Sequence, residues 1–292
     1  MRRKFRRNYK RNNFSDYIIN FLSICLALYL ILFTYNKFSH VQFKINIPQK
    51  NISAFQMPVQ NFFKLNSLSQ KYNIAFEELI TIYSLENNFF PNKSITASEN
   101  EIEQSMIINY NQVKKKYSPR LINQYSTMFK NIISDIKYFP IAADVCTEND
   151  LPYIYGDNWE KTYRAKIPQG CNIFDRENIS ARIPIVSMTD GKISNINWDD
   201  SLGYNIAIIS SNQNKYIYCH FDKFANNLQK NSEIEAGQLL GYMGNTQKDE
   251  LYKSVHLHLC ISPKTTFVSD DFFINPYLFL RLIETQKASL GD

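Results

Sequence analysis

Three of the four histidines of this chain lie in two short segments whose composition is typical of β-strands. One is His220, and the other two, His256 and His258, are separated by a single residue. Residues two apart on a strand project from the same face, so this pair is expected to lie side by side. Imidazole is the commonest metal ligand and the commonest general base near neutral pH. The pattern predicts a zinc-hydrolase corner completed by a histidine from another strand. The alternative is that the three histidines pack as ordinary core or surface residues.

The net charge of +6 comes from the start of the chain. Seven of the 33 basic residues lie within residues 1–11, which contain no acidic residue, and the rest of the chain carries 26 basic and 27 acidic residues. A nucleic-acid-binding domain would keep its basic patch on the folded surface. The sequence therefore predicts no nucleic-acid partner, and we expect residues 1–16 to form a basic cytoplasmic arm.

An uncharged apolar run from Tyr17 to Tyr35 follows that arm. About 20 apolar residues cross the hydrocarbon core of a bilayer. A cleaved signal peptide would have a shorter run and a small-residue cleavage site, whereas this run ends in bulky aromatic residues. A buried core helix is the other alternative, but it leaves the flanking charge asymmetry unexplained. We therefore expect a transmembrane helix over 17–35 in the cell membrane, with a cytoplasmic N-terminus and an extracytoplasmic C-terminal domain.

Composition and the spacing of apolar residues divide the remaining chain into four parts. Residues 36–64 predict a linker, 65–138 a small helical segment, 139–285 a mainly β domain, and 286–292 a tail. In the helical segment, apolar spacing predicts short helices before Pro91-Asn92 and a second stretch from about Glu101 to Tyr138. In the β domain, β-branched and aromatic segments between turn signals predict strands over 183–186, 192–196, 204–209, 215–220, 238–243 and 256–261. Asp190-Gly191, between the first two, predicts a hairpin.

Several short motifs follow one another at characteristic spacings in the β domain. They are Ile183-Pro184-Ile185-Val186, Asp190-Gly191, Gly203-Tyr204-Asn205, Tyr218-Cys219-His220, Glu235-Ala236-Gly237-Gln238 with Gly241 and Gly244, and His256-Leu257-His258. Together they resemble the LytM/lysostaphin-type zinc metalloendopeptidases, which cut peptide cross-bridges in bacterial cell walls. The resemblance covers about residues 138–285. It implies an antiparallel β-sheet domain, of the duplicated hybrid motif fold, with a groove across one sheet.

In that family, zinc is held by a His-x-x-x-Asp motif and by the second histidine of His-x-His. The resemblance implies that His258 is a metal ligand and that His220 and His256 are the catalytic acid/base pair beside the metal-bound water. The first motif departs from the pattern, because Pro168 stands at the histidine position and Asn172 at the aspartate position. Proline has no side-chain donor atom, and an asparagine oxygen is neutral and suits hard ions better than zinc. We therefore expect a degenerate site and no bound cofactor, with zinc only if the ligand set is replaced.

Cys260 is the candidate for such a replacement. It shares the strand face of His256 and His258, whereas Cys171 and Asp175 lie at odd offsets from Asn172 and should point away from it. The alternative for the cysteines is plain packing, since a free thiol behaves as a small hydrophobe. The five cysteines show no CxxC spacing, and the sequence gives no disulfide pairing.

Three functional hypotheses follow. The first is a membrane-anchored extracytoplasmic domain that has lost hydrolysis and acts in cell-wall remodelling, division or sporulation by binding a peptidoglycan peptide or a cell-envelope protein. The second is an active zinc-dependent cell-wall endopeptidase with a replaced ligand set. The third makes the helical segment the functional part and the β domain a spacer. The lost ligands favour the first hypothesis.

Overall fold

The computed structural model describes residues 54–87, 89, 96–142, 151–159, 168–248, 254–265 and 272–290. All described residues belong to one compact unit, 47–292. The expected basic arm and transmembrane helix lie outside the described residues. Within the described ranges, no helix is both long enough and apolar enough to cross a membrane.

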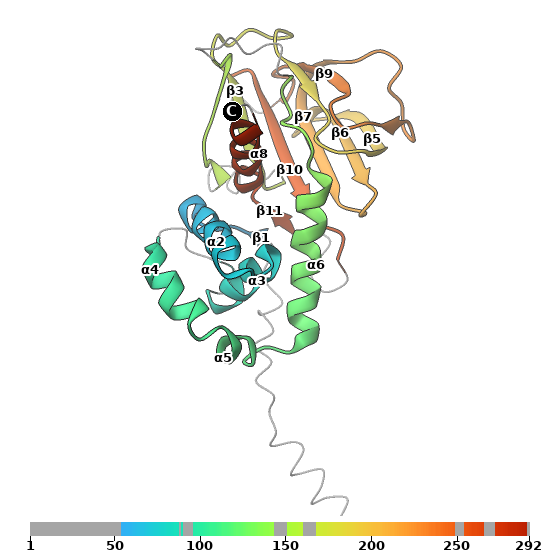
Figure 1. Cartoon of the computed structure of the whole chain (residues 1–292). Coiled ribbons are helices and arrows are strands. Elements are labelled where there is room, and N and C mark those ends of the chain that lie inside the picture. The colour runs from blue at the N-terminus through green and yellow to red at the C-terminus, as the bar shows by residue number, and fades with distance from the viewer. Residues whose placement is uncertain are drawn as a thin grey trace, which may run out of the picture. The chain divides into compact units, whose positions relative to one another are not determined.

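Short helices make up the first part of this unit (Figure 1). They are α2 (Val59–Tyr72), α3 (Phe76–Glu86), α4 (Glu99–Ile102), the π-helical turn η1 (Glu103–Ile107), α5 (Tyr110–Lys114) and α6 (Pro119–Asp135). Serine caps begin two of them, since Ser98 forms a capping box with Glu101 and the Ser118 hydroxyl accepts from the next turn of α6. Proline favours the first turn of a helix, so Pro119 begins α6. The helical stretch expected over 101–138 is therefore divided.

Residues 54–64, expected as the end of a linker, are instead part of the core. The short strand β1 (Ala54–Phe55) pairs in parallel with β11 (Phe273–Ile274), and α2 begins soon after it. The fully buried side chains of this stretch include Phe55, Met57 and Phe62. Burying three large apolar side chains stabilises the fold by several kcal/mol, about 1.5–3 kcal/mol each. The remaining linker residues, 36–53, lie outside the described residues.

The β domain is an 11-stranded sheet in the order β1-β11-β10-β7-β6-β5-β8, with β3 beside β10, β2 beside β3, and β9 between β7 and β4. The bounds not yet given are β2 (Tyr153–Tyr155), β3 (Cys171–Asp175), β4 (Pro184–Val186), β5 (Gly191–Asp199), β6 (Gly203–Ser210), β7 (Lys215–Phe224), β8 (Glu233–Ile234), β9 (Leu239–Met243) and β10 (His256–Ser262). Among the described strands, every pairing except that of β1 with β11 is antiparallel. The expected antiparallel β fold is confirmed. A last helix, α8 (Pro276–Leu290), continues past residue 285, the expected end of the β domain, and includes most of the expected tail.

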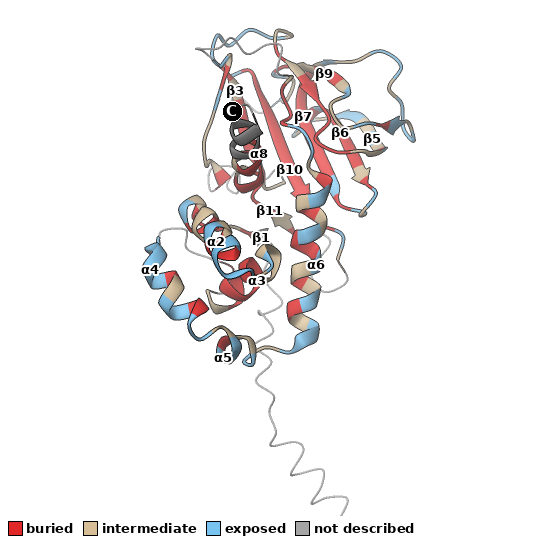
Figure 2. Ribbon diagram, viewed as in Figure 1, coloured by how far each residue is buried: buried red, intermediate tan, exposed pale blue. Residues whose placement is uncertain are grey.

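Alternation along β10 separates a core face from a second face. Leu257, Leu259 and Ile261 belong to the main hydrophobic core, together with residues of α8. The intervening positions, His256, His258 and Cys260, point to the opposite face, as a period of two requires. Both faces are buried, and Figure 2 shows β10 and β7 buried along most of their length. A polar set of residues is thus enclosed beside an apolar core.

The Asp190-Gly191 prediction of a hairpin is wrong. β4 pairs with β9, whereas β5 pairs with β6 and β8. Gly191 instead permits close packing, because a Cβ there would lie 2.3 Å from the carbonyl oxygen of Ile209 on β6. Asp190 accepts the backbone N–H of Ala236 and pairs with Lys137. The dipeptide is used for tertiary contacts that a local turn rule does not include.

One buried carboxylate joins the helices to the sheet. Asp135, the last residue of α6, accepts hydrogen bonds from Ser210 Oγ (2.6 Å), Asn212 Nδ2 (2.8 Å), Asn214 Nδ2 (2.7 Å) and Tyr216 OH (3.3 Å). These donors lie on and around the turn between β6 and β7. Because a buried carboxylate needs such partners, this cluster fixes α6 against the sheet.

Candidate functional site

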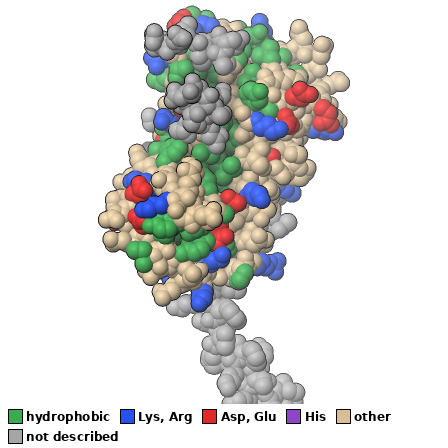
Figure 3. All heavy atoms as spheres, viewed as in Figure 1, with side chains coloured by type: hydrophobic (Ala, Val, Ile, Leu, Met, Phe, Trp, Pro, Cys, Tyr) green, Lys and Arg blue, Asp and Glu red, His purple; other side chains and the backbone are tan. Residues whose placement is uncertain are grey.

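The structure brings the three singled-out histidines together on the second face of the sheet. The ring centroids of His220 and His256 are 4.6 Å apart, and those of His220 and His258 are 5.9 Å apart. All three side chains are almost fully buried, with 2 %, 1 % and 0 % of the residue exposed. No histidine is visible on the face drawn in Figure 3, in keeping with this burial.

A β-bulge turns His220 toward the other two histidines. Tyr204 of β6 faces Phe221 of β7, but the next residue, Asn205, faces Cys219, so His220 is the extra residue on β7. Its φ is 69°, in the left-handed region that few non-glycine residues adopt. A regular β7 would place His220 on the core side with Tyr218. Bulges of this kind often re-aim a side chain beside a functional site.

His258 is held at both ring nitrogens. Its Nδ1 lies 2.6 Å from Asn172 Oδ1, and its Nε2 lies 2.9 Å from the carbonyl oxygen of Pro168. The thiol sulfur of Cys260 is 3.1 Å from the same Nε2. Burial lowers the pKa of His258, but Cys260 and the Pro168 carbonyl outweigh it and the pKa is raised. Burial likewise raises the pKa of the Cys260 thiol, but hydrogen bonds from Cys219 and His258 outweigh it and lower that pKa to about 6.

His256 and His220 are neutral at physiological pH. Burial, with a smaller contribution from His258, lowers the pKa of His256 to about 4, although its hydrogen bond to the carbonyl oxygen of Ser254 opposes this. The His256 ring stacks on Phe174, at a centroid distance of 5.3 Å. Burial and the other two histidines hold the pKa of His220 well below its usual value. Within the described part of the chain, His220 Nδ1 is buried without a hydrogen-bond partner.

A neighbouring asparagine fixes Asn172. The Asn172 N–H donates to Asn158 Oδ1 (2.9 Å), and Asn158 Nδ2 donates to the Asn172 carbonyl (3.0 Å). Asn172 is also the register partner of His258 across β3 and β10. Just before β3, a Cβ on Gly170 would lie 2.8 Å from His258 Cε1 and 2.9 Å from Cys260 Sγ, so the backbone passes directly over the pair. Neither Asn158 nor Gly170 belongs to a motif that predicts a site: one is an asparagine in a loop, and the other is a glycine before a strand.

These residues do not fit a zinc site. Two ligands of one tetrahedral zinc, each about 2.0–2.1 Å from the metal, lie about 3.3 Å apart, whereas His258 Nδ1 and Asn172 Oδ1 are 2.6 Å apart and share a hydrogen bond. Pro168 contributes only its backbone carbonyl, which faces the other ring nitrogen. Among the described residues, no group of three or more His, Cys, Asp or Glu side chains could hold a metal ion. Cys171 and Asp175 do not replace the lost ligands, since the first is in the main core and the second pairs with Arg182.

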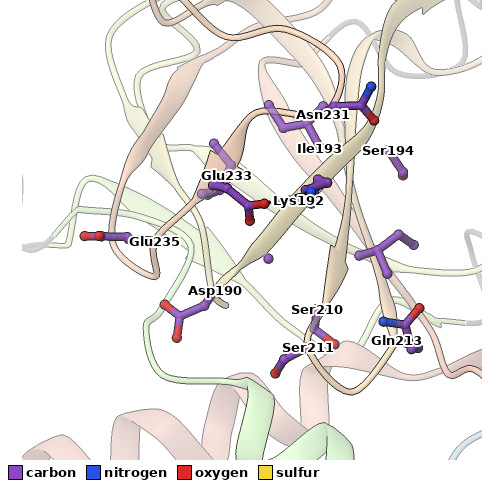
Figure 4. A pocket seen from close by; sticks show the side chains of 13 residues that line it. Asp190, Lys192, Ile193, Ser194, Ser210, Ser211, Gln213, Asn231, Glu233 and Glu235 are labelled. Atoms are coloured by element: carbon purple, nitrogen blue, oxygen red, sulfur yellow. Dashed lines mark ion pairs between the residues drawn. The ribbon is translucent and has the colours of Figure 1, made fainter.

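Two of the hollows lined by described residues are candidates for a ligand site. A hollow of about 370 Å³ borders the site, because Asn172 and Phe174 line it together with Ile154, Tyr155 and Asn158. The other, of about 630 Å³, lies over β5, β6 and β8 and is shown in Figure 4. Its charged side chains include Lys192 and Glu233, which form an ion pair of 2.8 Å. It contains no histidine or cysteine, so the first hollow is the one associated with the site.

Comparison with known proteins gives the same assignment as the motifs. Residues 170–269 match the family described as Peptidase family M23. Residues 170–269 form an M23 peptidase domain. This stretch contains Asn172, His220, His256 and His258, whereas Pro168 lies just before it. No curated protein matches the chain at a significant level in sequence.

Solved structures of LytM and lysostaphin type resemble the chain. A Ruminococcus gnavus protein, provisionally named a glycyl-glycine endopeptidase lytM, is 25 % identical over 82 % of this chain and 92 % of its own, with a TM-score of 0.57. Lysostaphin from Staphylococcus simulans is 23 % identical over 39 % of this chain and 44 % of its own, with a TM-score of 0.33. A SpoIIIAH–SpoIIQ complex structure is 12 % identical over 50 % of this chain and 99 % of that chain, with a TM-score of 0.38. The first likeness extends well beyond the M23 domain, so it includes helical residues.

Proposed function

We propose that this chain is a membrane-anchored, extracytoplasmic protein whose M23 domain binds a cell-wall peptide without zinc-dependent hydrolysis. The M23 fold and the hollow at the site support a peptide ligand. The altered donor set supports the absence of metal chemistry. A cell-envelope protein in place of the wall peptide is the outcome that binding experiments would distinguish.

The observation that carries the proposal is the direct hydrogen bond between His258 and Asn172. In the family pattern, these two positions would both face the metal. Here the neutral amide and the imidazole satisfy each other at 2.6 Å, and Pro168 provides no side-chain donor. A metal would have to break that bond and would gain no charge neutralisation from the amide. Loss of even an outer partner weakens metal binding about 10–100-fold, so loss of two direct ligands should weaken it far more.

The hollow beside Asn172 supports peptide binding. Its lining combines Ile154, Tyr155 and Phe174 with polar side chains that could orient a ligand, as ligand sites generally do; the polar residues are Asp157, Asn158 and Asn172. Ile154 lines it while keeping 51 % of the residue exposed, so it can contact a bound peptide without being part of the core. The site therefore offers an apolar surface next to buried polar groups.

The proposed membrane anchor is inferred from the amino-acid sequence. The uncharged run 17–35 follows seven basic residues, and basic residues beside a span favour the cytoplasmic side. The peptidase domain would then lie where cell-wall peptides are. Membrane fractionation of the full chain, with protease added to spheroplasts, tests this: the domain should stay with the membrane and be digested from outside. Digestion only after lysis would overturn the orientation.

Wall binding is tested with two matched variants of the full chain in detergent. Ile154→Asp places a charge in the hollow, and Ile108→Asp places the same charge at a residue that is 71 % exposed and does not line it. We expect co-sedimentation with purified peptidoglycan to weaken at least about 10-fold for the first variant, because a charge in an apolar contact costs more than about 1.4 kcal/mol. Equal binding by both variants would reject the hollow as the peptide site. Solubilisation of the wall by the zinc-loaded parent would reject the loss of hydrolysis.

A further inference from the structure

The outer side of β5 is open over the second half of the strand. β5 lies next to the end of the sheet (Figure 1), and the end strand β8 pairs only with its first two residues. The last backbone bonds on that side belong to Ile193, which donates to the Ser232 carbonyl and accepts from Asn231. Among the described residues, no strand and no other backbone group pairs with the outer side of 194–199. We call this stretch, residues 194–199, the β5 edge.

The β5 edge lacks the charges and prolines that usually protect an open strand. Native proteins place such residues on edge strands because unpaired backbone groups can pair with another chain. Residues 194–198 contain neither a charged residue nor a proline. The bulge of β5 lies at the β8 end, and from Asn195 to Asp199 the strand keeps a regular register with β6. The covered half, in contrast, carries the ion pair of Lys192 with Glu233. The β5 edge is therefore suited to receive a further strand.

The side chains of the β5 edge alternate between an amide face and an apolar face. Asn195 and Asn197 are both exposed on one face, where Asn195 Nδ2 donates to Asn197 Oδ1 (2.9 Å). Ile196 and Trp198 share the other face, as the period of two requires. Ile196 packs against the main core, whereas Trp198 is 41 % exposed, with its Nε1 donating to the Thr246 carbonyl (3.2 Å). An added strand would therefore meet amides on one face and a fixed aromatic ring on the other.

We propose that the β5 edge pairs with the β5 edge of a second copy of this chain, antiparallel and centred on Asn197. Asn197 is the midpoint of the regular open stretch, and a two-fold axis there places it opposite Asn197 of the second copy. Ile196 of each copy then faces Trp198 of the other, so an apolar pair forms twice. Asn195 faces Asp199 of the second copy, so no two charged side chains of the edge oppose each other. In this register the strand is complementary to itself.

The contact between two strand edges is small. Stable complexes bury about 1,200–2,000 Å² in total, and a short strand pair alone buries less. The self-association is therefore weak and is favoured where copies are held at a high local concentration. The proposal goes beyond wall binding and does not depend on it. A strand from a different protein at the same edge is the alternative that the experiments exclude or reveal.

Cysteine substitution tests the register directly. In Asn197→Cys the two new thiols face each other, with Cβ atoms about 4.5–5.5 Å apart, close to the separation that a disulfide requires. The matched control is Asn195→Cys, on the same exposed face, because the pairing shifts its two copies by four residues, about 13–14 Å along the strand. The full chain in detergent is treated with a mild oxidant, and disulfides are located by peptide mass spectrometry.

We expect the disulfide between two copies of position 197 to form at least about 10-fold faster than that between two copies of position 195, because only the first pair has the required geometry. Both variants should melt as the parent does, since both side chains are exposed. Equal rates at the two positions, or no disulfide between copies of position 197, would overturn the pairing.

A charge exchange at the axis distinguishes a second copy from any other partner. Asn197→Asp and Asn197→Lys each place like charges directly opposite each other, so each variant alone should associate at least about 3-fold more weakly than the parent. An equimolar mixture of the two places opposite charges together and should restore association. The assay is sedimentation of the full chain in detergent over a range of concentrations. A mixture no more associated than its components would overturn the proposal, and so would a parent whose mass does not rise with concentration.

Discussion

Replacing Asp135 with alanine should uncouple the helices from the sheet. The carboxylate is 3 % exposed and accepts from Ser210, Asn214 and Tyr216, which are themselves 2 %, 1 % and 0 % exposed. Alanine removes the shared acceptor and leaves these buried donors without it. Since α6 ends at this residue, the contact between the helical part and the β6–β7 turn depends on it.

The loss of stability in Asp135→Ala follows from the number and type of hydrogen bonds that the substitution removes. A hydrogen bond to a charged group contributes about 1.5–3 kcal/mol net, and a buried donor left without a partner costs about 1–3 kcal/mol. Two good bonds, from Ser210 and Asn214, are lost together, while the cost of burying the carboxylate is relieved. The net loss in the free energy of unfolding should therefore be similar to that for breaking a buried ion pair, about 3–5 kcal/mol. For a folded unit of this size, 3 kcal/mol corresponds to a fall in Tm of about 6–12 °C.

Thermal and urea unfolding of the full chain in detergent, followed by circular dichroism, measure this effect. The matched control is Asp200→Ala, because Asp200 pairs with Lys248 at 2.6 Å while both side chains are about two-thirds exposed (67 % and 66 %). Exposed ion pairs contribute at most about 1 kcal/mol, so the control should shift Tm little. If both variants lost less than about 1 kcal/mol, the buried cluster would not hold the helices, and the reasoning from donors and burial would be refuted.

Three further predictions follow. Burial lowers the pKa of His256 to about 4, whereas the pKa of a histidine in the unfolded chain is about 6.5. As the pH falls, the unfolded state therefore binds the proton before the folded state does. The free energy of unfolding should decrease by up to about 3 kcal/mol between pH 6.5 and pH 4. In urea titrations at stepped pH, His256→Gln should flatten that dependence, and an unchanged slope would contradict it. Pro168→His with Asn172→Asp should raise zinc affinity at least about 100-fold in calorimetric titration, and no gain over the parent would mean that this segment is wrongly aligned. Gly191→Ala should destabilise the chain by about 1–3 kcal/mol, because its Cβ would lie 2.3 Å from a backbone oxygen of β6; a melting curve equal to the parent's would show that β5 moves aside.

The positions of the strands could be predicted because local composition reflects burial. β6 and β7 overlap the predicted segments 204–209 and 215–220, and β10 overlaps 256–261. The period of two also places His256 and His258 on one face, which is where the structure has them. Such patterns depend only on the alternation of side chains along one strand.

What the sequence did not reveal depends on neighbours that are distant in the chain. The bulge at His220 arises from the register of β7 against β6, and no residue type near it requires an extra residue. The contact of Asn158 with Asn172 joins a loop to β3 across 14 positions. The Asp190-Gly191 error has the same origin, since the glycine is needed for packing against Ile209 and not for a turn. Tertiary context therefore decided the geometry of the site.

The central claim is that the M23 domain lacks a zinc centre, because Pro168 provides no donor and Asn172 bonds to His258 instead of to a metal. Zinc content of the purified full chain, measured by mass spectrometry after dialysis against metal-free buffer, tests this most directly. The account predicts well below one zinc per ten chains. One zinc per chain, lost in parallel with the substitution His258→Ala, would contradict it.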